Sequence, residues 1–281
     1  MPVLANKLTR RTPWETNTPW FRFYTFLVVA VAFLCVLNGT VVTTNEYRPL
    51  YSFGAFHSAS GAIVGALSLG LAIWLSFGRE RTWVRRLGWA AVTLVAIEGA
   101  LGLSGTLTPA VRVAHAFLAL IFFAVSVEIA VVTSRPWLSA TRLPGSRPFL
   151  RGLAILALLA TLTQGVLGVA FRHGILGIMP HVLGALAAAV IVVVLAMTVM
   201  YGLEHRMLHS VAVTMLIVTA LQVFLGLILF SISAVVDTEP LIVITSMMIH
   251  TAAAAVMLAA TVTLTLLIWH IVGRGKTERG S

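Results

Sequence analysis

Four histidines are the residues of this sequence best placed to do chemistry. Each stands near the start of a long apolar segment, at positions His57, His115, His181 and His250. An ionisable side chain inside a bilayer is costly, and so by default it marks a functional site. Neutral imidazole is a common axial ligand of haem iron, and two imidazoles on facing helices make a six-coordinate b-type site. We therefore predict that these histidines are metal ligands.

A polar residue followed by glycine precedes each histidine. The four copies are Asn38-Gly39, Glu98-Gly99-Ala100-Leu101-Gly102, Gln164-Gly165-Val166-Leu167-Gly168 and Gln222-Val223-Phe224-Leu225-Gly226. The polar residue lies 19, 17, 17 and 28 positions before its histidine. Four copies of one helical hairpin, or two copies of a four-helix half, would produce this pattern. The last spacing is longer because of the loop around Asp237 and Glu239.

The composition indicates a membrane protein. Of the 281 residues, 59% are hydrophobic and only 10% are charged, whereas soluble domains have roughly 25% charged residues. A spanning helix needs about 20 apolar residues. Eight segments satisfy this requirement: Phe21–Thr43, Ala55–Phe77, Arg86–Leu107, Val111–Thr133, Phe149–Phe171, Leu176–Tyr201, Val211–Ile232 and Ile242–Ile271. The predicted fold is an all-α integral membrane protein with eight transmembrane helices.

The net charge of +10 follows the predicted topology. Sixteen of the nineteen basic residues flank the helices on one side, which leaves Arg48, Arg112 and Arg172 on the other. This asymmetry is the positive-inside pattern, and it predicts a multi-pass protein of the cell (inner) membrane with both termini in the cytoplasm. It explains the basic charge without a nucleic-acid partner. Cys35 is the only cysteine, so an internal disulfide is excluded.

The repeat divides the chain into residues 1–140 and 141–281, each with four predicted helices. An even number of helices in each half makes the halves insert in parallel, as two pseudo-repeats related by an axis along the membrane normal. All four histidines begin even-numbered helices, which run from outside to inside. We therefore expect them at similar depth in the outer half of the bilayer.

Small residues follow each histidine by three or four positions, on the same helix face. They are Ser60 and Gly61, Ala119, Gly184 and Ala185, and Ala253 and Ala254. Such residues would leave a slot for a flat macrocycle, or they would simply form packing seams between membrane helices. Zinc is a rival use of histidine clusters, but the sequence offers it no thiolate partners and no tight local spacing.

Further candidate residues lie near the histidines. The outer arginines Arg48, Arg112 and Arg172 suit carboxylate binding, and haem propionates would be natural partners; the alternative is that they are ordinary loop charges. Glu98 lies at the level of the histidines, where it would relay protons or steer a substrate as a catalytic residue. A hydrogen-bonding role between helices remains equally open for Glu98.

Together these features resemble the haem A synthase family. The resemblance covers the chain from about Leu37 to Ile268, and its most specific parts are the motifs at Glu98, Gln164 and Gln222 with their histidines. Members of that family oxidise the methyl group of haem O to the formyl group of haem A, for cytochrome oxidase assembly. The resemblance therefore implies an oxidoreductase.

The resemblance also implies roles for the histidines and for partners. His181 and His250 would ligate a resident haem b that relays electrons, and His57 and His115 would hold the substrate haem. An electron donor, a supplier of haem O and oxidase assembly factors would be partners, besides the lipid bilayer.

The chain departs from the family at its first histidine. The family usually carries a glutamate three residues before that position, where this sequence has Gly54. The first outer loop also lacks the cysteine pair found in many members. Two alternatives stay open beside the synthase. One is a b-type cytochrome or haem-handling paralogue without the synthase reaction, and the other is a transporter with histidines as proton carriers.

Overall fold

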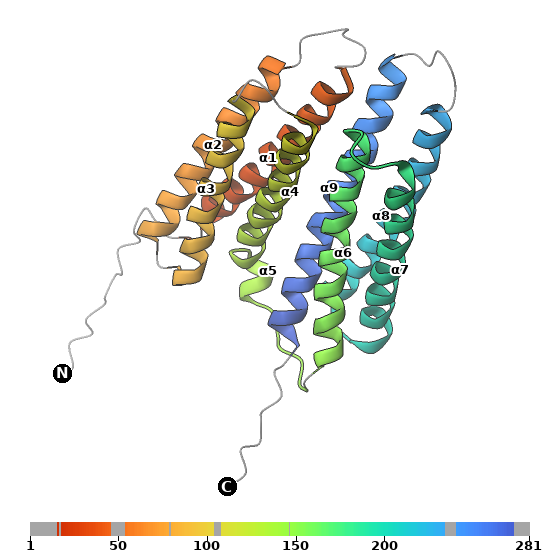
Figure 1. Cartoon of the computed structure of the whole chain (residues 1–281). Helices are drawn as coiled ribbons and strands as arrows, with labels where there is room; N and C mark the ends of the chain where they lie inside the picture. The colour runs from red at the N-terminus through yellow and green to blue at the C-terminus, as the bar shows by residue number, and fades with distance from the viewer. Residues whose placement is uncertain are drawn as a thin grey trace, which may run out of the picture.

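The computed structural model describes residues 16, 18–45, 54–78, 80–103, 108–145, 147–233 and 240–272. Within these residues the chain forms eight long helices and one short helix (Figure 1). They are α1 (Pro19–Asn45), α2 (Gly54–Phe77), α3 (Thr82–Leu103), α4 (Pro109–Val132), α5 (Arg135–Leu138), α6 (Pro148–Arg172), α7 (Ile178–Gly202), α8 (Arg206–Ser233) and α9 (Pro240–Ile271). The eight long helices are all long and apolar enough to cross a membrane. This confirms the predicted all-α membrane fold.

Helix boundaries differ from the predicted spans where polar residues flank an apolar core. Helix α3 begins at Thr82 rather than Arg86, and α8 begins at Arg206 rather than Val211. A span predicted from hydropathy leaves out such charged residues, whereas the observed helix continues through them because their backbone is hydrogen-bonded. The short α5 was not predicted. Its start is capped by the Ser134 hydroxyl, which accepts from the Trp137 backbone N–H at 3.3 Å.

The long helices form two groups that lie side by side in Figure 1. Helices α1 to α4 contact one another in a closed ring, and α6 to α9 form a second ring. The groups meet where α1 and α4 contact α9, and where α4 contacts α6. The predicted division at residue 140 falls in the connection between α5 and α6. The relation of the two groups as a repeat stays a prediction.

Helix α9 is the most enclosed of the long helices. Within its most apolar window 61% of the residues are buried, against 11% for α3. Its residues Ala255, Leu258 and Val262 belong to the core of the first group. Leu264 and Ile268, on another part of α9, belong to the core of the second group. Helix α9 therefore joins the two cores.

Trp137 of α5 is a second connection between the groups, because its half-buried side chain packs against both cores. Its indole stacks on the imidazole of His270, with ring centroids 3.9 Å apart. Nε2 of His270 donates to the Trp137 carbonyl at 3.0 Å. Nearby, Nη2 of Arg151 donates to the Val272 carbonyl at 2.5 Å. The Arg151 contact satisfies the carbonyl of Val272, directly after α9, and the His270 contacts attach the last turn of α9 to α5.

Truncation of this tryptophan tests its role. Trp137→Ala is expected to destabilise the protein by about 2–3 kcal/mol, below the range for fully buried aromatic side chains because Trp137 is only half-buried. Trp20, which is 76% exposed, provides the control, since Trp20→Ala removes the same side chain from a lipid-facing position. The measurement is the midpoint of thermal unfolding in detergent. Equal midpoints for the two variants would contradict the connection.

Candidate metal centre

The four predicted histidines all lie against a glycine of the preceding long helix. A Cβ atom added to each glycine would meet the Cε1 atom of the histidine ring at a short distance. These distances are 3.1 Å from Gly39 to His57, 4.0 Å from Gly102 to His115, 3.0 Å from Gly168 to His181 and 3.5 Å from Gly226 to His250. The glycines stand near the ends of α1, α3, α6 and α8. The histidines therefore form one layer near one end of the bundle.

Each histidine also has a polar neighbour, four residues before that glycine. Nδ1 of His115 lies 2.8 Å from Oε2 of Glu98. The remaining neighbours are Gln164 Nε2, 2.9 Å from His181 Nδ1; Gln222 Nε2, 3.2 Å from His250 Nε2; and Cys35 Sγ, 4.0 Å from His57 Nδ1. Residues four apart stack on one helix face. At this spacing, the polar side chain contacts a nitrogen of the ring, and the glycine leaves room for the same ring.

Cys35 corrects the predicted register of the first copy of the motif. The sequence pattern paired Asn38 with His57, but the amide nitrogen of Asn38 donates to the Ser60 hydroxyl at 3.5 Å. Successive residues on a helix project about 100° apart, so Asn38 cannot share a face with its neighbour Gly39. The uniform interval of four residues from polar group to glycine would have identified Cys35. Sequence reasoning considered this cysteine only as a disulfide partner.

The polar neighbours determine which ring nitrogen of each histidine carries the proton, and the result differs between the histidines. Nδ1 of His115 lies 2.8 Å from the Glu98 carboxylate, at an angle that makes no hydrogen bond. The negative charge favours the proton on this nitrogen, which would leave Nε2 with a lone pair for a metal. The amide nitrogen of Gln164 also donates to the His181 carbonyl, at 3.0 Å. That bond fixes the nitrogen of the amide toward His181, whose Nδ1 then acts as acceptor. The two halves of the chain therefore hold their histidines differently.

The first pair of histidines has a geometry that suits two axial ligands. The ring centroids of His57 and His115 lie 6.2 Å apart, with an interplanar angle of 80°. Two imidazoles bonded to one metal ion at about 2 Å each would have centroids roughly 6 Å apart. These two residues therefore fit a shared iron.

The second pair has the two imidazoles that a haem iron needs, but its amide neighbours face the rings with their nitrogens. Nδ1 of His250 is buried without a hydrogen-bond partner among the described residues. Because the amide nitrogen of Gln222 faces Nε2 of that ring, Nδ1 carries the proton, and Gln222 must rotate its amide before Nδ1 is free as a ligand. The ring of Phe171 lies parallel to that of His181, with centroids 6.1 Å apart. The amide of Gln164 must also rotate, so that its oxygen faces Nδ1 of His181. Only then does Nδ1 carry the proton and Nε2 keep a lone pair for a metal.

The predicted slots beside the histidines differ between the halves. A Cβ atom on Gly61 or Gly65 would meet nothing within 4 Å, so space exists beside His57. At Gly184 an added Cβ would lie 2.5 Å from Gln164 Oε1 and 2.5 Å from Leu167 Cδ1. The close approach of α6 fills that position. Beside His181 the glycine is a packing seam, which was the alternative interpretation.

The structure describes two of the three predicted outer arginines, Arg112 and Arg172. Nη2 of Arg172 donates to the Thr40 carbonyl and to the Thr44 hydroxyl of α1, so this side chain links the outer ends of α6 and α1. Arg112 lies half-buried on the first turn of α4, one turn before His115. Arg48, like Asp237 and Glu239 of the last outer loop, lies outside the described residues. The assignment of these arginines to haem propionates stays a prediction.

Zinc finds no site within the described part of the chain. No three or more His, Cys, Asp or Glu side chains come together there, whereas protein zinc sites use three or four such ligands. Axial ligation of a haem iron requires only two. Each pair of histidines could supply these two ligands, and the haem assignment stays a prediction.

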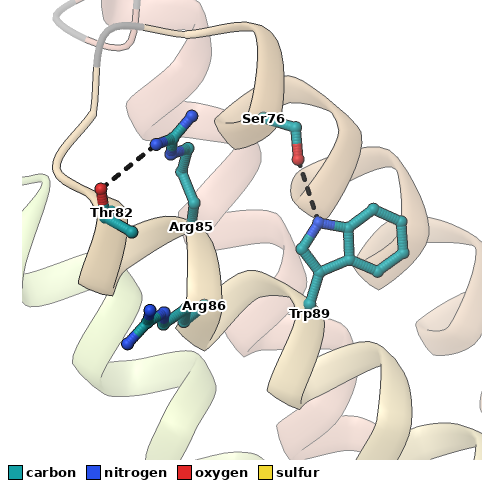
Figure 2. Close-up of a pocket in the computed structure, with 5 residues that line it drawn as sticks. All are labelled: Ser76, Thr82, Arg85, Arg86 and Trp89. Atoms are coloured by element: carbon teal, nitrogen blue, oxygen red, sulfur yellow. Dashed lines mark hydrogen bonds between the residues drawn. The ribbon is translucent and has the colours of Figure 1, made fainter.

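A surface pocket lies at the other end of α2 and α3, away from the histidines. It has a volume of about 310 Å³ and is lined by Ser76, Thr82, Arg85, Arg86 and Trp89. Figure 2 shows Arg85 directed at the Thr82 hydroxyl, 3.2 Å away, and the Trp89 indole directed at the Ser76 hydroxyl, 3.0 Å away. None of these five side chains is a metal ligand. Tryptophan and arginine are typical of the membrane–water interface.

In comparisons with known proteins, no protein-family model and no curated protein matches this chain. The structure by itself defines a multi-pass membrane protein with a layer of four paired histidines. Its resemblance to haem A synthases therefore depends on the histidines and on the polar residues and glycines that contact them.

The glycine contacts give a graded prediction. Gly168→Ala and Gly39→Ala are expected to destabilise the protein by about 1–3 kcal/mol, because the new methyl group forces the histidine ring to move. Gly226→Ala and Gly102→Ala, whose contacts are ordinary van der Waals distances, should change stability much less. Gly99→Ala is the matched control, since its Cβ would meet nothing within 4 Å. Thermal unfolding midpoints of the five variants give the order, and an equal effect at all five positions would refute it.

Proposed function

We propose that this protein is a membrane haem protein of the haem A synthase type, which oxidises the methyl group of haem O to a formyl group. The observation that supports this most is the layer of four histidines, each placed between a glycine and a polar side chain of the preceding helix. The 6.2 Å separation of the His57 and His115 rings adds the spacing that two axial ligands require.

In this proposal the two pairs have different tasks. His181 and His250 hold a resident haem b, which supplies one-electron transfer when bound. His57 and His115 hold haem O, the substrate. Conversion of the methyl to the formyl group balances with dioxygen as the oxidant, which supplies the oxygen atom and is otherwise reduced to water (R–CH3 + O2 → R–CHO + H2O); haem b would relay electrons during this oxidation and would therefore need to lie close to the substrate. One histidine of each pair, His115 on α4 and His250 on α9, lies on helices that contact each other.

Glu98 is the carboxylate that we assign to this chemistry. Gly54 stands where the family has a glutamate, and a side chain there would meet nothing within 4 Å. Glu98 instead reaches the pair from α3, with Oε2 on His115. Its Oε1 atom is buried and has no hydrogen-bond partner among the described residues. Such an oxygen can accept a proton released near the two rings.

The proposal includes the orientation in the membrane. Arg85 and Arg86 lie at the end of the bundle opposite to the histidine layer. By the positive-inside rule this end faces the cytoplasm, and eight spans then leave both termini on that side. The histidine layer faces the outside of the inner membrane.

A b-type cytochrome or haem-handling paralogue without synthase activity is the second candidate. The observation that favours it is the absence of an acidic side chain at position 54. It uses the same histidines and the same haem b, and it differs only in the fate of haem O.

An absorption spectrum tests the haem assignment that both candidates share. The purified protein is expected to show a reduced b-type spectrum, and His181→Ala or His250→Ala should abolish the contribution of the resident haem b, because each removes an axial ligand. His205→Ala, on the short connection between α7 and α8, is the control and should keep the full spectrum. A protein expressed with ample haem that carries none would refute both candidates.

Pigment extraction separates the two candidates. Co-expression with a source of haem O is expected to yield hydroxylated or formyl haem, and Glu98→Gln should reduce the yield at least tenfold, within the usual effect of removing a catalytic acid or base. Glu128→Gln removes a carboxyl from α4 about 20 Å further along the helix from His115 and should leave the yield unchanged. Unmodified haem O in a host with a working electron supply would favour the cytochrome.

A further inference from the structure

The two histidine pairs differ in the charge and strength of their polar neighbours. In the pair of α2 and α4, His115 contacts the carboxylate of Glu98 at 2.8 Å, whereas His57 has only the Cys35 thiol at 4.0 Å. In the pair of α7 and α9 both neighbours are neutral amides, at 2.9 and 3.2 Å. Thus one pair combines a strong anionic partner with a weak one, and the other has two similar partners.

We propose that Glu98 fixes His115 as the permanent axial ligand of the first pair and lowers the reduction potential of an iron held there, while His57 is the exchangeable ligand. Displacement of His57 opens a coordination position to a small neutral ligand, of the class of carbon monoxide. This proposal rests on the proposed occupancy of the pair by haem.

The effect of Glu98 follows from its position on the ring. A carboxylate beside Nδ1 favours the proton on that nitrogen and makes the imidazole a stronger donor through Nε2. It also adds a negative charge beside the metal, which favours ferric over ferrous iron. The side chain of Glu98 is only 12% exposed and that of His115 is 23% exposed, so water screens this charge weakly. Besides its proposed role as a proton acceptor, Glu98 therefore also acts on the iron through His115.

The weaker attachment of His57 has two causes. A thiol is a poor hydrogen-bonding group, and 4.0 Å is the outer limit for a contact to sulfur. His57 also lies on the first turn of α2, which begins at Gly54, and helix ends fray. The space beside Gly61 and Gly65 can receive a displaced ring. The carbonyl of His57 accepts from the Ser60 hydroxyl at 2.8 Å, so the weak contact is confined to the ring; the ring of His181 has the closer Gln164 amide at 2.9 Å.

A redox titration of the haem-loaded full-length protein tests the role of Glu98. Glu98→Gln is expected to raise the potential of the haem at His57 and His115, by roughly tenfold in the ferric–ferrous equilibrium or about 59 mV for one electron. Gln164→Glu should lower the potential of the other haem by a similar amount. Glu128→Gln is the control, because it removes a carboxyl of α4 that lies far from His115, and it should change neither potential.

Carbon monoxide added to the reduced protein tests the role of His57. Binding is expected at one haem only, and it should become faster in His57→Ala, because that variant leaves the coordination position open. Cys35→Gln, which copies the neighbours of His181 and His250, should slow binding at least tenfold by holding His57 more firmly. In each variant, retention of the b-type spectrum of the haem at His181 and His250 shows that the protein is folded.

The outcomes are distinguishable from failure of the proposed function. Absence of haem from the wild-type protein overturns the haem assignment itself. Haem that is present but unchanged in potential by Glu98→Gln, or carbon monoxide that binds at the haem of His181 and His250 instead, overturns this inference and leaves the haem assignment intact.

Discussion

A histidine ring within the apolar span of a helix needs room and a polar neighbour, because lipid supplies no hydrogen-bonding partner. In each hairpin of this protein the preceding helix provides both. A glycine lies against the ring, and a polar side chain four residues earlier on the same face contacts one of its nitrogens. The direction and spacing of the two helices in a hairpin follow from this contact. A larger residue in place of the glycine would separate the helices or displace the ring.

Connections between the two groups of helices bring the histidine pairs together. Helix α9 carries His250 and also contributes to both hydrophobic cores, so one ligand of the second pair belongs to the most enclosed helix of the bundle. Arg172 links α6 to α1 near the histidine layer, and Trp137 joins the cores at the opposite end. If the proposed function holds, these connections would keep the two haem sites at a constant separation.

The four hairpins differ in the side chains that contact their histidines, and these differences distinguish the two pairs. An exact repeat would give four equivalent histidines, but their neighbours are a thiol, a carboxylate and two amides. The carboxylate and the thiol belong to the same pair, beside which Gly61 and Gly65 leave open space. The two amides belong to the pair where α6 fills the space at Gly184. Under the proposed function, the first pair would hold the exchangeable substrate and the second the permanent cofactor.

The sequence by itself determined the class of fold, since only membrane helices accommodate eight apolar segments of this length. It also determined the four histidines and three of their neighbours, Glu98, Gln164 and Gln222, because fixed spacing on a helix fixes the face. Tertiary structure alone decided that Cys35 rather than Asn38 contacts His57, that α6 occupies the space beside Gly184, and that Arg172 binds α1. Each of these depends on how one helix is rotated against another, and rotation is set by packing across the whole bundle, which local spacing does not encode.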